Sequence, residues 1–192
     1  MLSLFRDIRA ERVALRDLRA MQSGEWVCSC CGQTHTGLQD IGFQSPDPWP
    51  HEQTYKPNSE LNFEGDFLSE DFCVMNGRDF FVRTVLLLPI QKLDCALGVG
   101  VWSTLSEESF REYIVGFDDP DANIGSEYFS WLANRIPFLN DKELTKTYIV
   151  TLPDRQRPYV KADPDSQAGL AQSDGLSPQM AIELYSLGGH SP

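Results

Sequence analysis

Hydrophobic residues recur at helical spacing near the amino terminus and at strand spacing in the middle of the chain. In residues 1–22, apolar side chains lie three or four positions apart with arginines between them, which predicts an amphipathic helix ending before Ser23 and Gly24. Segments 71–76 and 79–90 are rich in β-branched and aromatic residues, and the dipeptide Asn76-Gly77 is favoured in two-residue hairpin turns. They therefore predict an antiparallel hairpin.

The pattern after this hairpin mixes strands and helices without regular β-α-β alternation. Ser106 is a predicted N-cap, because Glu107 and Glu108 follow it and carboxylates stabilise the first turn of a helix. We expect strands at 94–105, 142–152 and 157–162, an aromatic-rich segment at 128–136, helices at 106–116 and 177–187, and loops at 118–121 and 163–175. This order predicts an α+β fold: an α+β domain at 25–192 with a mainly antiparallel sheet, preceded by a helical extension at 1–24.

Composition and charge narrow the class of protein. The chain has 192 residues, of which 41% are hydrophobic, enough for one substantial core. The net charge of -12 argues against nucleic acids and anionic membrane surfaces as partners, since both need clustered cations on the protein. The same charge predicts a basic protein partner. We find no apolar run of about 18 residues that would predict a membrane span.

The cysteines indicate a reducing compartment. There are five, an odd number, and three of them lie within residues 28–31, which makes a poor disulfide framework. Arginines near the amino terminus also interrupt the apolar stretch that a secretion signal needs. We therefore expect a soluble, cytoplasmic protein.

The candidate chemistry lies in the segment Cys28-Ser29-Cys30-Cys31-Gly32, which His35 follows. Two residues between Cys28 and Cys31 let both sulfurs face one side of a tight turn, as in half of a tetrahedral zinc site. Gly32 can adopt positive φ, which turns backbone amides toward the sulfurs. A closed site needs four ligands, and the predicted set is Cys28, Cys31, His35 and Cys73.

Other interpretations of the same residues stay open. Cys95 and His51 are weaker candidates for the fourth ligand, because nothing local pairs them with the turn. The Cys28–Cys31 pair could instead exchange electrons, or all these thiols could be reduced core residues. The chain contains no phosphate-binding loop, dinucleotide-binding glycine pattern or His-Glu-x-x-His motif.

A further set of landmarks runs through most of the chain. These are Cys28-x-x-Cys31-Gly32-x-x-His35, Asp71-Phe72-Cys73-Val74, Phe80-Phe81-Val82-Arg83, Gly100-Val101-Trp102-Ser103-Thr104-Leu105-Ser106-Glu107 and Tyr128-Phe129-Ser130-Trp131-Leu132. Their order resembles a bacterial domain-of-unknown-function family, number twenty-one ninety-nine, over roughly Val27 to Leu187. The resemblance implies a small cytoplasmic α+β protein from bacteria and no established activity.

Two function classes follow from these observations. The first is a non-enzymatic protein-binding domain with an acidic surface, in which the cysteine turn is a structural element held by zinc. The second is a zinc- or thiol-dependent enzyme that uses Cys28, Cys31 and His35. A catalytic zinc keeps one coordination position for water, whereas a structural zinc is closed by protein ligands.

Overall fold

The computed structural model describes residues 2–117, 119, 125–153 and 156–190. The chain forms two compact units, and each unit combines segments that are distant in the sequence. Unit 1 consists of Met1–Gly42, Leu87–Val99 and Leu170–Pro192, and unit 2 consists of Phe43–Leu86 and Gly100–Gly169. Among the described residues, no helix combines the length and the apolar character that crossing a bilayer requires.

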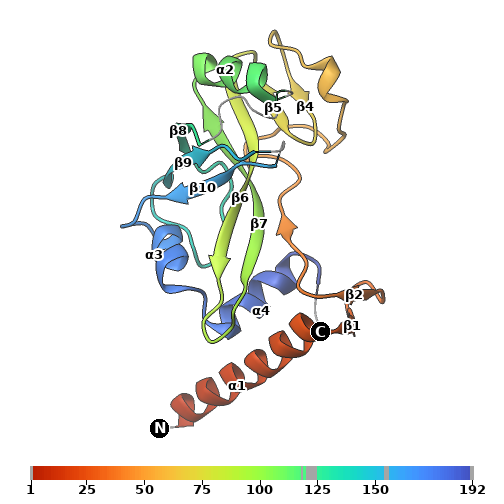
Figure 1. The fold of residues 1–192 in the computed structure, drawn as a ribbon, viewed down its shortest axis with the longest axis vertical. Coiled ribbons are helices and arrows are strands. Elements are labelled where there is room, and N and C mark those ends of the chain that lie inside the picture. The colour runs from red at the N-terminus through yellow and green to blue at the C-terminus, as the bar shows by residue number, and fades with distance from the viewer. Residues whose placement is uncertain (1, 118, 120–124, 154–155, 191–192) are drawn as a thin grey trace. The chain divides into compact units, whose positions relative to one another are not determined.

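Unit 1 contains the two ends of the chain. Helix α1 (Leu2–Ser23) packs against helix α4 (Pro178–Leu187) and strand β1 (Glu25–Val27), as Figure 1 shows. Leu18 and Met21 are buried on α1, which fits the amphipathic helix that the sequence predicts. Strand β1 pairs with β2 (Thr34–Thr36), and β3 (Ile41–Gly42) follows.

Both ends of α4 are fixed by local hydrogen bonds. Ser177 is its N-cap, accepting a hydrogen bond from the Met180 amide at 3.2 Å, and Pro178 follows at the start of the helix. At the other end, Gly189 has φ of +87°, its amide donates to Ser186 O, and the next amide donates to Tyr185 O. This pair of bonds is a Schellman motif, which stops the helix and turns the chain back.

Replacing Ser177 by alanine should lower the free energy of unfolding by about 1 kcal/mol, because the Met180 amide loses its acceptor. Ser177→Asp should retain most of the stability, since aspartate is an equally good N-cap. Urea denaturation of the three proteins measures the difference. Equal stability of the alanine variant and the wild type would contradict this role of Ser177.

Unit 2 combines antiparallel strands with helical segments. Its elements are the 3-10 turn Asn58–Glu60, β4 (Phe67–Leu68), β5 (Phe72–Met75), α2 (Glu107–Phe117), β8 (Glu127–Trp131), β9 (Lys146–Val150) and β10 (Tyr159–Ala162). Strands β6 (Asp79–Pro89) and β7 (Ala96–Leu105) contribute residues to both units. The sheet order is β3-β7-β6-β10-β9-β8, with β5 pairing with β4 and β6. Strands β10 and β6 form a parallel pair.

The core of unit 2 includes a cluster centred on Trp102, whose side chain is fully buried. Leu68, Cys73, Met75 and Phe81 pack in the same cluster. A second group of rings joins α2 to the strands, with Phe110 in contact with Phe72 and Phe80 at centroid distances of 5.9 and 5.1 Å. Aromatic side chains thus supply much of the buried surface of this unit.

The predicted α+β fold with a mainly antiparallel sheet and an N-terminal helix is confirmed. The predicted hairpin is also present, with Asn76 and Gly77 at φ of 54° and 63°, the conformation of a type I′ turn. The predicted loop at 118–121 lies outside the described residues except for Asp119. The proposed division between 1–24 and 25–192 stays a prediction.

The prediction of a loop throughout 163–175 is wrong, because helix α3 (Gln167–Asp174) lies there. Its sequence is polar and contains Gly169, which lowers helix propensity. The glycine is required by packing, since a Cβ at this position would lie 2.0 Å from the carbonyl oxygen of Asp163. Ser166 caps the helix by accepting a hydrogen bond from the Gly169 amide at 2.9 Å.

Candidate metal centre

The hairpin of β1 and β2 places two side chains of the candidate centre, Cys28 and His35, on one face. Trp26 pairs with His35 across the two strands, and their rings lie 5.0 Å apart. Cys28 comes two residues after Trp26, and side chains two residues apart on a strand face the same side. The pairing register therefore brings Cys28 and His35 together.

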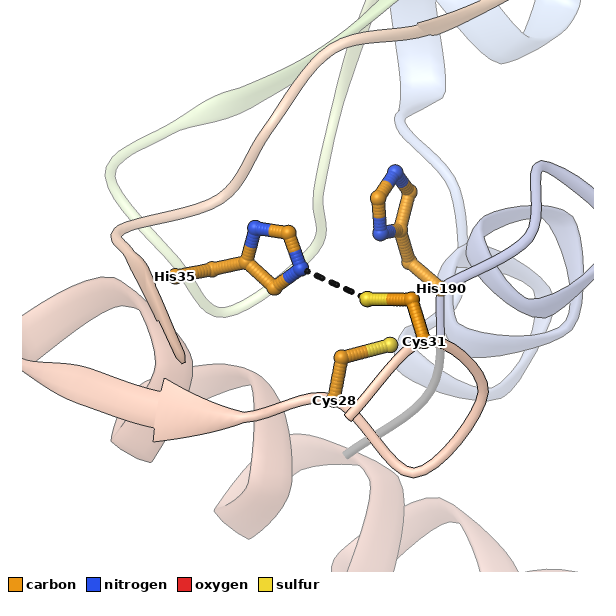
Figure 2. Close-up of side chains that lie close together, drawn as sticks. All are labelled: Cys28, Cys31, His35 and His190. Carbon is orange, nitrogen blue, oxygen red and sulfur yellow. Dashed lines mark hydrogen bonds between the residues drawn. The ribbon is translucent and has the colours of Figure 1, made fainter. Parts of the chain in front are cut away.

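The turn between the two strands has the geometry that the Cys-x-x-Cys-Gly spacing predicts. The amide of Gly32 donates a hydrogen bond to Cys28 O at 2.8 Å, and the amide of Cys28 donates to Gln33 O at 2.9 Å. Gly32 has φ of +70°, a left-handed conformation that other residues adopt at a cost. These bonds close the turn and bring the side chain of Cys31 back toward Cys28, as Figure 2 shows.

A fourth side chain reaches the same point from the carboxyl-terminal end of the chain. The Schellman motif after α4 turns His190 back beside Tyr185, with the two ring centroids 5.3 Å apart. The His190 ring also meets the His35 ring edge to face, at a centroid distance of 4.9 Å. Nδ1 of His190 is buried and has no hydrogen-bond partner, which is unusual for a buried polar atom.

The donor atoms of Cys28, Cys31, His35 and His190 all lie within 4.8 Å of one another. Figure 2 shows the four side chains directed toward a common point, and Cys31 Sγ lies 3.3 Å from His35 Nε2. A tetrahedral zinc site with two sulfur and two nitrogen ligands has edges of roughly 3.3 to 3.8 Å. The widest pair of donor atoms would therefore need to close by roughly 1 Å.

The four side chains of the group differ in their exposure to solvent. Cys28 is buried, His35 and His190 are partly buried, and Cys31 is exposed. Tyr185 packs against Trp26 with ring centroids 5.8 Å apart. Aromatic rings thus cover part of the group.

Tyr185 also links α4 to the segment after β2. Its hydroxyl oxygen accepts a hydrogen bond from the Gln39 amide at 2.9 Å. Burial raises the pKa of Tyr185 above its ordinary value of 10, and the nearby Cys28 contributes a smaller rise. The phenol therefore stays neutral at physiological pH.

Three of the four predicted ligands belong to this group, and His190 is the fourth member in place of Cys73. Cys73 lies on β5 in the buried cluster of unit 2, where burial strongly raises the pKa of its thiol. His51, a weaker candidate, lies 2.6 Å from an Asp66 carboxylate oxygen, and Cys95 is likewise outside the group. Cys30 is exposed and is not a member of the group either.

The comparison with known families covers most of the chain. Residues 27–176 match the family described as "Uncharacterized protein conserved in bacteria (DUF2199)". The chain belongs to this family. The match includes Cys28, Cys31 and His35 and ends before His190. Neither the curated proteins nor the solved structures gave a match.

Membership of the family confirms the resemblance that the sequence landmarks indicated, and the family description gives no activity. The chemistry of the donor set is more informative. Two thiols and two imidazoles are the donors that zinc and other borderline or soft transition metals prefer, whereas calcium and magnesium prefer oxygen. The Cys28–Cys31–His35–His190 group could therefore hold a transition metal.

Proposed function

We propose that this chain is a zinc-binding, non-catalytic protein in which Cys28, Cys31, His35 and His190 form a structural zinc site. The observation that carries the proposal is the convergence of four protein donors on one point. Two thiolates neutralise the charge of Zn²⁺, and two cysteines with two histidines form a familiar closed set in structural zinc sites. The site would join the turn after β1 to the segment after α4.

The closed donor set favours a structural role over a catalytic one. A catalytic zinc has three protein ligands and a fourth position for water or substrate, whereas this group offers four protein ligands. Burial of the Cys28 side chain disfavours Cys28 as the attacking thiolate in an exchange reaction, because such a thiolate needs access. The proposed role of the metal is to hold unit 1 together.

A binding function for the whole protein stays a prediction. It is based on the net charge of -12, which favours fast association with a cationic protein. A structural metal is compatible with such a role, because it supplies a rigid surface without chemistry of its own. The cytoplasmic location expected from the reduced cysteines is likewise a prediction.

The metal content of untagged protein tests the proposal. We expect one zinc per wild-type chain after dialysis, measured by elemental analysis, and less than about a tenth of that in Cys28→Ser. Cys30→Ser is the matched control, because it removes a thiol from the same turn that is outside the group. This variant should retain the zinc.

Two results would contradict the proposal. One is wild-type protein without stoichiometric zinc after growth with zinc and gentle purification. The other is zinc that is retained by Cys28→Ser and Cys31→Ser. A zinc-loaded protein whose X-ray absorption spectrum shows a bound water in place of one histidine would instead favour the enzyme hypothesis.

A further inference from the structure

Unit 2 contains a cavity of about 580 Å³. Its volume lies within the range of about 300–1,000 Å³ that is common for small-molecule sites. Met75, Phe81, Leu132 and Ala133 form an apolar wall, and Leu144 adds to it from the loop before β9. Met75 and Phe81 belong to the Trp102 core cluster, so a rigid part of the unit supports this wall.

Hydrogen bonds between the walls fix the shape of the cavity. The amide of Leu132 donates to Thr145 O at 2.9 Å, and the amide of Ala133 donates to Trp102 O at 2.8 Å. Leu132 is also paired with Ser103 in an isolated β-bridge. The cavity is therefore bounded by backbone that the sheet holds in place, a property of sites that are formed before the ligand binds.

Charged side chains around the cavity are mostly acidic. Four carboxylates line it, those of Asp47, Asp79, Asp141 and Glu143, against one guanidinium, that of Arg135, which gives the lining a net charge of -3. An apolar surface next to uncompensated carboxylates is complementary to a molecule with an apolar body and a positive charge.

Two of the four carboxylates are already bound by neighbouring groups. Asp47 accepts hydrogen bonds from Asn134 Nδ2 and from the Arg135 amide, both at 2.8 Å. Asp141 accepts from Thr145 Oγ1 at 3.1 Å and from the Gln167 amide at 3.2 Å. These two side chains are positioned as part of the wall.

The side chains of the other two carboxylates accept no hydrogen bond from the described part of the chain. Glu143 is exposed and has no hydrogen bond or ion pair within the described part of the chain. Asp79 forms an exposed ion pair with Arg78, whose Nε lies 3.7 Å from a carboxylate oxygen, a distance too long for a hydrogen bond. Both can therefore receive an ammonium group without losing an existing hydrogen bond.

We propose that the cavity of unit 2 binds a small organic amine, with its apolar body against Met75, Phe81 and Leu132 and its ammonium group at Asp79 and Glu143. The proposal goes beyond the zinc site, which is formed by residues of unit 1, and it does not depend on the metal. The net charge of the chain favours the approach of a cation.

Methyl NMR on zinc-replete, full-length protein tests this proposal. The chain has four methionines, so ¹³C-methyl labelling gives a simple spectrum in which Met75 reports on the cavity and Met21 and Met180 serve as internal controls. The probes are 4-phenylbutylamine, 4-phenylbutanol and 4-phenylbutyrate, which share one apolar body and differ in charge. We expect the amine to shift the Met75 methyl signal saturably, with a dissociation constant of roughly 1 mM or lower.

The charge preference is tested with the same three probes. The amine should bind at least about fivefold more tightly than the alcohol, and the carboxylate should bind more weakly than the alcohol. Asp79→Asn and Glu143→Gln should each weaken amine binding by about three- to fivefold and leave alcohol binding unchanged. Glu108→Gln, an exposed carboxylate outside the lining, is the matched control and should have no effect.

Leu144→Ala tests the apolar wall. Its side chain is 59% exposed, so the substitution should not disturb folding, and it should weaken binding of both the amine and the alcohol. The proposal is overturned if the Met75 signal does not respond to the amine at about 10 mM, a concentration well above the expected dissociation constant. Equal affinity for the amine and the carboxylate would also overturn it.

Discussion

Removing zinc from the wild-type protein is expected to accelerate amide hydrogen exchange in the cysteine turn by at least about a thousandfold. A ligand that binds only the folded state at a free concentration a thousandfold above its dissociation constant adds about 4 kcal/mol of stability. The exchange rates of the Cys28 and Gly32 amides report directly on opening of the turn, because both amides donate hydrogen bonds within it. The His190 amide reports on the far side of the site, since it donates to Tyr185 O.

The expected loss is large because little else fixes this segment. Strands β1 and β2 have three residues each, and an isolated two-stranded hairpin is marginally stable in water. Trp26 and Cys28 are its buried side chains, whereas Val27 is 64% exposed. Without the metal, the hairpin would depend on these contacts and on the hydrogen bond from Trp26 Nε1 to Gly37 O.

Variants distinguish the effect of losing a metal ligand from other effects of a substitution. His190→Ala should exchange as fast as the chelated wild type and should bind zinc at least about a hundredfold more weakly. His51→Ala is the matched control, because His51 lies outside the group. Chelation should accelerate amide exchange in the cysteine turn of this variant as much as in the wild type. Identical exchange of the Cys28 and Gly32 amides with and without zinc would contradict a structural role for the metal.

Three of the four members of the metal group, Cys28, Cys31 and His35, were predictable because their geometry is local. The Cys-x-x-Cys-Gly spacing fixes a turn, and the pairing of Trp26 with His35 follows from the short hairpin around that turn. His190 has no such signal, because it lies 155 residues after His35 and is positioned by the docking of α4 in unit 1. The sequence signal for His190 is numerical: it is one of three histidines in the chain, and neither it nor His51 lies near the cysteine turn in the sequence.

The elements of the fold likewise differ in whether local sequence signals predict them. The hairpin around Asn76 and Gly77 was predictable, because its turn residues and the β-branched and aromatic residues of its strands indicate the same structure. Helix α3 was not, because its polar residues and Gly169 give little helical signal. It forms where Ala168 and Ala171 can be buried and where a glycine lets two backbone segments approach closely. Tertiary packing overrides propensity at such a position.

Replacing Asn134 by alanine is expected to lower the free energy of unfolding of unit 2 by about 3 kcal/mol. The side chain is 3% exposed, and its Oδ1 accepts a hydrogen bond from the Trp102 amide at 2.8 Å. Its Nδ2 donates to Ser45 O at 2.9 Å and to Asp47 at 2.8 Å. Truncation leaves the Trp102 amide and Ser45 O without partners, and each buried orphan costs about 1–3 kcal/mol.

Urea denaturation measures this loss, with Asn140→Ala as the matched control. Asn140 lines the same cavity but is exposed, so its truncation should change stability by less than about 0.5 kcal/mol.

Asn134→Asp is a more severe change at neutral pH, because a carboxylate would replace the donor that faces Ser45 O and Asp47. Burial and the adjacent negative charge would raise the pKa of the new carboxyl group above its unfolded value. The loss relative to wild type should therefore shrink as the pH falls through that raised pKa and the group becomes neutral. A loss that does not change with pH would contradict the assignment of the destabilisation to the charge of the new carboxylate.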